Sequence, residues 1–179
     1  MRLFDKLFVR AKSKVRIAIP NDKLVILSRK KLVGESFSDR RLMGFSSEAC
    51  QFLSCKFERM HIESASFGGG RSESLYEDCS FDGSEIYGSP GIARFERCTF
   101  RDVRIEGFFS LAGSFIDCVF SGDIRGSVFH GSLPDSIYGP RDNEFRGNDF
   151  REARLVDVDF RGGIDMSKQQ MPVSWSIAQ

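Results

Sequence analysis

The chain has 179 residues and a formal net charge of +1, with 26 lysine and arginine residues against 25 aspartate and glutamate residues. This length predicts one domain with enough chain to bury a continuous core. No apolar run approaches the roughly 20 residues of a membrane span. The first residues also lack the apolar block and small-residue cleavage site of a secretory signal, so we expect a cytoplasmic protein.

Charge is distributed unevenly along the chain. Residues 1–30 carry nine basic and two acidic residues, whereas residues 31–165 carry 16 basic and 23 acidic residues. The sequence therefore predicts a basic N-terminal element in front of a moderately acidic body.

The basic element contains apolar residues at helical spacing, Leu3, Phe4, Leu7 and Phe8, which predict an amphipathic helix over residues 1–14. Two short strands are predicted at residues 15–19 and 24–27, with residues 20–22 as the turn between them. We interpret residues 1–30 as a cap over the first repeat. An arm that contacts a membrane surface or a polyanion is the alternative.

From residue 93 to residue 122 the sequence repeats every five residues. One position of this unit holds Phe95, Phe100, Ile105, Phe115 and Phe120, and the position two residues earlier holds Ala93, Cys98, Val103, Gly113 and Cys118. The period is neither the 3.6 of a helix nor the sustained 2 of a long strand. It fits a strand of about three residues with alternate side chains inward, followed by a corner. Four such sides close a coil, so we predict an all-β, right-handed, four-sided β-solenoid whose coils stack at about 4.8 Å.

The repeat extends over most of the chain, from residue 31 to residue 165. It begins with Leu32, Phe37, Leu42, Ser47, Phe52, Phe57, Ile62 and Phe67, resumes at Phe81 and Ile86, and ends with Phe145, Phe150, Leu155 and Phe160. Its register breaks at residues 68–78 and 131–142, which we interpret as loop insertions. Residues 166–179, with the only tryptophan, Trp175, are predicted to cap the last coil, and a homodimer contact through this end is the alternative.

All five cysteines occur two residues before a phenylalanine, in the small inward position of the repeat: Cys50, Cys55, Cys79, Cys98 and Cys118. A free cysteine behaves as a small, buried apolar residue. The odd count and the absence of a secretion signal argue against a disulfide framework. We therefore expect reduced, structural thiols, with the last four stacked along one wall.

The unit of a small residue, a polar residue, Leu or Phe and two polar residues resembles the pentapeptide-repeat family. The resemblance covers about three-quarters of the chain, and it implies a right-handed quadrilateral β-helix. Known relatives are mostly non-enzymatic. Some, the quinolone-resistance proteins, resemble B-DNA in shape and charge and bind type II topoisomerases, whereas others are effectors or immunity-type proteins that bind a protein partner.

No catalytic, cofactor-binding or metal-binding motif accompanies the repeat. The sequence contains no Cys-x-x-Cys pair, no phosphate-binding loop and no nucleophile elbow. His61 and His130 each follow or precede an inward residue, where a solvated side chain is expected. We therefore predict no enzyme activity, no cofactor and no metal.

These observations favour a bacterial, non-enzymatic protein-binding module of inhibitory or immunity type that acts through its outer faces and loops. Two alternatives remain, a topoisomerase-binding DNA mimic and a membrane-associated effector. No direct nucleic-acid binding is expected. In the loops the candidate partner-binding residues are Arg71, Leu75, Tyr76, Tyr138 and Arg141. On the side that follows Ile62, Ile86, Ile105 and Phe150 the candidates are Glu63, Glu85, Glu106, Asp149 and Glu152.

Overall fold

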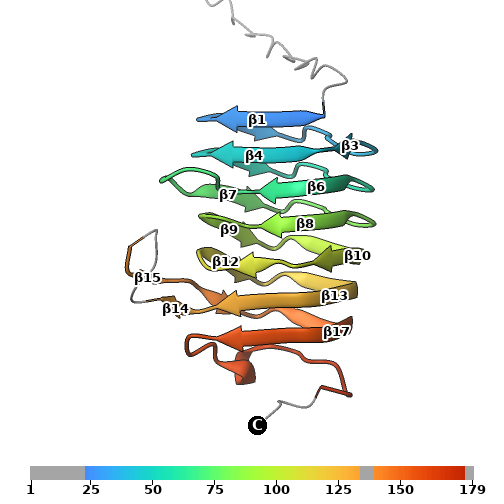
Figure 1. Cartoon of the computed structure of the whole chain (residues 1–179), viewed down its shortest axis with the longest axis vertical. Coiled ribbons are helices and arrows are strands. Elements are labelled where there is room, and N and C mark those ends of the chain that lie inside the picture. The colour runs from blue at the N-terminus through green and yellow to red at the C-terminus, as the bar shows by residue number, and fades with distance from the viewer. Residues whose placement is uncertain (1–22, 134–138, 176–179) are drawn as a thin grey trace, which may run out of the picture.

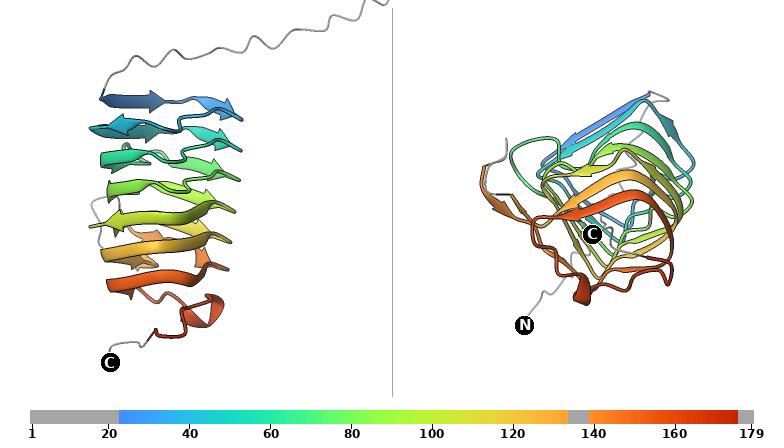
Figure 2. Two further views of the ribbon diagram at one scale, coloured as in Figure 1. Left: turned by 90° about the vertical axis from the view of Figure 1, so that its right-hand side faces the viewer. Right: turned by 60° about the horizontal axis from the view of Figure 1, so that its bottom comes forward.

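The computed structural model describes residues 23–133 and 139–175, which form a rod of stacked β coils (Figures 1 and 2). The predicted helix at residues 1–14, the strand at 15–19 and the turn at 20–22 lie outside the described residues. The second predicted strand is confirmed as β1 (Leu24–Ser28). No helix among the described residues is long and apolar enough to cross a membrane.

Two parallel sheets run the length of the rod. The larger has nine strands, in the order β1, β4 (Gly44–Glu48), β6 (His61–Ser66), β8 (Glu85–Ser89), β10 (Thr99–Glu106), β13 (Val119–His130) and β11 (Phe109–Ser110), with β17 (Asp149–Arg161) on β13 and β3 (Arg41–Leu42) on β6. The smaller has six strands, β16 (Phe145–Arg146), β12 (Gly113–Ile116), β9 (Ala93–Glu96), β7 (Ser74–Glu77), β5 (Gln51–Leu53) and β2 (Lys31–Val33). A short antiparallel pair, β14 (Ser132–Leu133) and β15 (Arg141–Asp142), and the 3-10 turn η1 (Met166–Lys168) complete the described elements.

The strand register establishes the repeat directly. In the regular coils, residues that pair between neighbours are 20 apart in sequence, as in Lys31 with Gln51 and Thr99 with Val119, which corresponds to four five-residue units per coil. The spacing becomes 24 across the first insertion and 30 across the second. Because Leu24 pairs with Gly44 in the same ladder, the coils begin within the segment predicted as a cap, not at residue 31. The described chain is thus a β-solenoid of pentapeptide repeats, as the sequence predicted.

The interior is a set of aromatic stacks. The predicted wall is confirmed, because the rings of Phe57, Phe81, Phe100 and Phe120 lie parallel with centroids 4.7–4.9 Å apart. This spacing is that of neighbouring strands, so each ring lies directly over its counterpart in the next coil. A second stack lies beside the first and contains Phe52, Tyr76, Phe95 and Phe115.

The last coil differs from the prediction. The expectation grouped Phe150 with Ile105, but Phe150 stacks on Phe120 at 4.4 Å, and Phe145 pairs with Phe115. The step from Phe115 to Phe145 is 30 residues instead of 20, so the second insertion adds ten residues. The insertion thus equals two whole repeat units. Inward positions remain inward after it, but each later residue stacks over a different position of the earlier coils.

Corners of the coils require backbone in the left-handed region. Ten described residues other than glycine have positive φ angles near 50–60°, and half of them are aspartates: Asp39, Asp78, Asp102, Asp117 and Asp157. A short polar side chain tolerates this conformation better than most residues. At Gly88, with a φ of 130°, an added Cβ would lie 2.5 Å from the carbonyl oxygen of Ala65, so only glycine fits there.

The five cysteines are free and buried, as the sequence predicted. Four of them form the expected wall, in which each thiol donates a weak hydrogen bond to a carbonyl of the previous coil, for example from Cys98 to Tyr76 at 3.2 Å and from Cys118 to Phe95 at 3.5 Å. Burial raises the pKa of the Cys98 thiol well above its ordinary value. A hydrogen bond with Cys79, together with burial, raises the pKa of Cys55. Cys55 and Cys98 therefore stay protonated at neutral pH, whereas the same hydrogen bond with Cys55 lowers the pKa of Cys79.

Phe100→Ala should lower the free energy of unfolding by about 3–5 kcal/mol, because the substitution removes buried apolar area and leaves a cavity between two coils. Urea unfolding followed by circular dichroism measures this change. The exposed Arg101→Ala variant is the control and should stay within about 0.5 kcal/mol of the parent protein. Equal stability of Phe100→Ala and the parent would contradict the stacked core.

Thiol titration of the native protein should find almost no reactive cysteine, and titration in denaturant should find five. The reason is burial, which shields all five sulfur atoms from the reagent. Rapid labelling of several cysteines in the folded protein would show that the wall is open to solvent.

Candidate protein-binding surface

One outer face of the rod carries a ladder of ionisable residues, each directly before an isoleucine or leucine of the repeat. Its members, one from each of six successive coils, are Arg41, His61, Glu85, Arg104, Asp123 and Arg154. From Glu85 to Arg154 the charges alternate, and neighbouring coils are joined by His61 to Glu85 at 2.9 Å and by Arg154 to Asp123 at 2.6 Å. We call this ladder the charged face.

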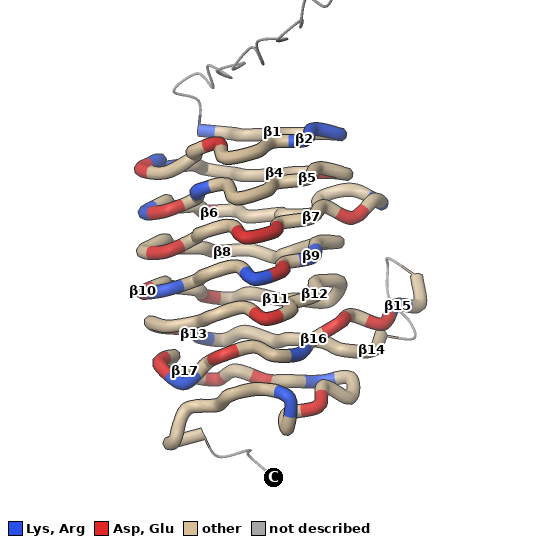
Figure 3. Tube along the Cα trace, turned by 180° about the vertical axis from the view of Figure 1, so that it is seen from behind, with Lys and Arg blue, Asp and Glu red and all other residues tan. Residues whose placement is uncertain are grey.

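Of the predicted acidic residues, Glu85 lies on the charged face, and Glu63 and Glu106 lie in the column beside it. They do not form an acidic surface, because Arg104 pairs with Glu106 at 3.2 Å and His61 lies between Glu63 and Glu85. This ladder and the column beside it contain equal numbers of carboxylates and arginines. The carboxylates are Glu63, Glu85, Glu106 and Asp123, and the arginines are Arg41, Arg104, Arg125 and Arg154. Figure 3 shows that basic and acidic positions are also interspersed over the back of the rod.

Asp149 and Glu152 do not belong to the charged face, which corrects the prediction. Asp149 pairs with Val119, and Glu152 pairs with Ser121, on a neighbouring part of the coil. The ten-residue insertion moved them, for the same reason that it moved Phe150. Asp149 is held by Arg151 at 2.7 Å, and this hydrogen bond lowers the pKa of the carboxyl group.

A second outer face carries no charge over six coils. Its column contains Ile26, Ser46, Ser66, Ser89, Phe109 and Val128, and the first charged member is Asp159 in the last coil. The side chains of Ile26 and Phe109 are 68% and 53% exposed. We call this column the uncharged face. The column could not be predicted from the five-residue period alone, because Ser46 and Ser66 are 20 residues apart but Ser66 and Ser89 are 23 apart.

The first insertion is shorter than predicted. Residues 68–73 form a turn between β6 and β7, in which Arg71 is exposed and its backbone N–H donates to Glu48 at 3.3 Å. Leu75 and Tyr76, expected in the loop, belong to β7 instead. Tyr76 is completely buried, so it is a core residue and not a partner-binding one.

Tyr76 has the environment of a core side chain. Its ring stacks between Phe52 and Phe95, and its hydroxyl lies 2.9 Å from the Ser47 hydroxyl and donates to the Phe67 carbonyl at 3.1 Å. Burial raises its pKa well above the ordinary value. The sequence prediction failed because Tyr76 replaces the usual phenylalanine after a four-residue shift of register, and the shift was interpreted as a longer loop.

The second insertion projects as the hairpin β14–β15, which contains Arg141. Tyr138 lies outside the described residues, and the role of both residues in binding stays a prediction. The hairpin and the turn at residues 68–73 leave the rod on the same side (Figures 1 and 2). Three coil steps separate them, from Tyr76 through Phe95 and Phe115 to Phe145, which corresponds to about 14 Å along the rod.

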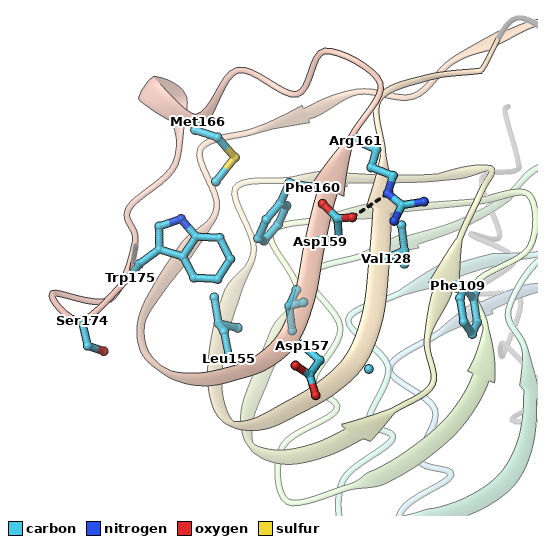
Figure 4. Close-up of a pocket in the computed structure, with 12 residues that line it drawn as sticks. Phe109, Val128, Leu155, Asp157, Asp159, Phe160, Arg161, Met166, Ser174 and Trp175 are labelled. Atoms are coloured by element: carbon cyan, nitrogen blue, oxygen red, sulfur yellow. Dashed lines mark hydrogen bonds and ion pairs between the residues drawn. The ribbon is translucent and has the colours of Figure 1, made fainter. Parts of the chain in front are cut away.

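A groove opens at the C-terminal end of the rod, below the uncharged face (Figure 4). Its volume is about 720 Å³, and its apolar lining includes Phe109, Val128, Leu155, Phe160 and Trp175. The indole of Trp175 meets the Phe160 ring edge-on at 5.5 Å. The tail thus packs on the last coil but leaves part of it open.

The described residues contain no group of three or more His, Cys, Asp or Glu side chains that could hold a metal ion. His61 is held in the charged face by its contact with Glu85. His130 lies beside the hairpin, where burial and the positive charge of Arg161 lower its pKa.

No family model matches, and no curated protein matches. Among solved structures, a trypsin-treated variant of QnrB1, a plasmid-mediated fluoroquinolone resistance protein, is 11% identical over 86% of this chain and 85% of its own, with a TM-score of 0.31. Full-length QnrB1 is 13% identical over 82% of this chain and 91% of its own, with a TM-score of 0.27. Because both TM-scores lie below 0.5, these similarities carry no weight for function; the register of the coils identifies the repeat by itself.

Tyr76→Ala should lower the free energy of unfolding by about 3–5 kcal/mol, as for other large aromatic residues in a core. Tyr76→Phe should cost only about 1 kcal/mol, because the Ser47 hydroxyl still donates to the Phe67 carbonyl at 2.7 Å. Thermal and urea unfolding of both variants measure the difference. A Tyr76→Ala protein with unchanged stability would mean that this side chain is outside the core.

Proposed function

We propose that this chain is a non-enzymatic protein-binding module of inhibitory or immunity type, and that it binds its partner through the uncharged face and the turn beside it. The observation that carries the proposal is the separation of charge between the faces. Ionisable residues are interleaved on the charged face, whereas the uncharged face has serine hydroxyls and exposed apolar side chains.

This separation matters for binding because of desolvation. Covering an ion-pair ladder removes water from every charge in it, which costs free energy unless the partner replaces those contacts. Covering serines and exposed apolar side chains costs much less and gains free energy from Phe109 and Ile26. The cores of protein interfaces are correspondingly depleted in charged residues.

A stack of parallel strands also suits recognition by a rigid surface. The column is held in place by ladder hydrogen bonds on both sides, so little conformational entropy is lost when a partner binds. Arg71 extends from the adjoining turn at the border of this face, where an arginine can serve as an interface anchor. A rigid rod that covers part of an enzyme would block access to it, and this is the basis for the inhibitory role.

The two alternative functions receive less support. A DNA mimic needs a surplus of carboxylates, because B-DNA presents one phosphate for about every 1.7 Å of its axis. On the charged face the carboxylates are matched by arginines, so its charge is balanced. A membrane-associated role depends on residues 1–22, which lie outside the described residues.

Affinity capture with the full chain as bait should identify a protein partner, and Ser66→Arg should weaken its binding by about tenfold or more, or about 1.4 kcal/mol. The reason is that the introduced guanidinium would place a charge in the middle of the uncharged face. Ser80→Arg is the matched control, since Ser80 has similar exposure but lies in the ladder of Lys56 and Thr99. Calorimetric titration gives both affinities.

Three results would contradict the proposal: the absence of any specific partner, unchanged affinity of Ser66→Arg, or equal weakening by the Ser80→Arg control. If the partner is an enzyme, its activity should fall as the chain is added. A topoisomerase partner whose binding is removed by Glu85→Lys and Glu106→Lys, but not by Ser66→Arg, would support DNA mimicry.

A further inference from the structure

The last coil of the rod has an open edge. Among the described residues β17 pairs with β13 on one side, and on the other side its only ladder contact is the bridge from Asp149 to Gln170. The stretch 151–161 therefore presents unpaired backbone groups along one edge of a long parallel strand. Such an edge is a template for another strand.

The tail of the chain already uses this edge in the way that another strand would. Gln170 donates its N–H to the carbonyl of Asn148 at 2.9 Å and accepts from the N–H of Phe150 at 2.7 Å. The tail then leaves the ladder at Pro172, which has no N–H to donate. From there it runs at a distance from β17 instead of pairing with it.

Two hollows lie between the tail and β17. One, of about 500 Å³, adjoins residues 151–154. The other is the groove of about 720 Å³ that adjoins residues 155–161. Ser174 lines both, so together they follow the open edge along its length, as Figure 4 shows for the second hollow.

The groove exposes side chains whose counterparts in the preceding coil are buried. Leu155 and Phe160 are half-buried, whereas Ile124 and Phe129, their counterparts one coil earlier, are fully buried. The indole N–H of Trp175 is buried at the same place and has no hydrogen-bond partner among the described residues. Both the apolar side chains and this donor are suited to a chain segment that adds at the edge.

The charged side chains along the open edge of β17 indicate which kind of peptide segment would bind there. At the edge Arg151, Arg154 and Arg161 are each paired with an aspartate, at 2.6–2.7 Å. The exposed carboxylates of Glu152 and Asp157 have no such partner among the described ion pairs and hydrogen bonds. The uncompensated charge along the edge is thus negative, which favours a basic segment.

We propose that the open edge of β17 binds an extended peptide segment of a partner protein, parallel to β17, with apolar side chains at alternate positions and a basic residue opposite Asp157. The peptide continues the ladder that Gln170 begins, and its apolar side chains cover Leu155 and Phe160 in the groove. This site rests on the proposed protein-binding function and specifies the chemistry of one contact.

The test is a selection of random linear nonapeptides, displayed on phage, against the full chain. Enriched peptides should have apolar residues at every second position and at least one lysine or arginine. A synthetic copy of one of them should lose at least tenfold in affinity when its alternate amides are N-methylated, because methylation removes the ladder donors but keeps the side chains.

Two pairs of protein variants locate the site. Ser174→Phe fills the groove from the tail side and should reduce peptide affinity at least tenfold, whereas Ser36→Phe, at an exposed serine near the other end of the rod, should leave it unchanged.

Asp157→Asn should weaken peptide binding about threefold or more in low salt, because it removes the carboxylate opposite the basic residue. Asp102→Asn, at a similar left-handed corner, is the control and should leave peptide affinity unchanged. Thermal unfolding checks that each variant is folded.

The proposal is overturned if no peptide is enriched, if N-methylated peptide binds equally well, or if Ser174→Phe retains full affinity. It is also overturned if the chain sediments as a dimer that Ser174→Phe converts to a monomer, because the edge then belongs to a second copy. Ser66→Arg should not affect peptide affinity. If Ser66→Arg removes the captured partner while no peptide binds, the proposed function survives and only the peptide site fails.

Discussion

The structure depends on one constraint, that each residue must lie over its counterpart one coil away. Strands in a parallel ladder are about 4.8 Å apart, and flat aromatic rings stack at nearly the same distance. A repeat with a phenylalanine at a fixed position therefore satisfies the backbone hydrogen bonds and the core packing together, as in the stack from Phe57 to Phe120. A coil longer or shorter than 20 residues must return to this register before the next strand begins.

This constraint applies to the inside and leaves the outside free. Inward positions accept only aromatic, aliphatic or small residues, and the thiol of Cys98 fits because it is small and can donate to a carbonyl of the previous coil. Outward positions face the same position of the next coil, so like charges would repel along the rod. The alternation of Glu85, Arg104 and Asp123 avoids that repulsion. The uncharged face avoids this repulsion because it has no charged side chains over six coils, and covering it therefore costs little desolvation free energy.

The sequence predicted the fold well because its strongest signal is the period itself. Phe100 and Cys98 could be assigned to the interior from spacing alone, and the structure agrees. The predictions failed where the register shifts. Tyr76 was expected on the surface because a five-residue rule cannot tell a short turn followed by a strand from a longer loop. Glu152 was expected beside Glu106 because the number of residues absorbed by the second insertion determines which column follows it.

The candidate surface was less predictable for a related reason. A face is formed by residues about 19 to 31 positions apart, so neighbours on it are distant in sequence, and Ser66 gives no local signal. The groove could not be predicted at all, since it depends on the path of the tail after Pro172 and on how far Trp175 lies from β17.

The two projections from one side of the rod, the turn at residues 68–73 and the β14–β15 hairpin, are positioned by the number of coils between them. Adding or removing a whole coil of 20 residues would change their separation by about 4.8 Å and would leave their direction nearly unchanged, apart from the small twist of the stack. The rod therefore acts as a ruler with a fixed unit, and the spacing of its two projections can be adjusted in discrete steps without altering either one.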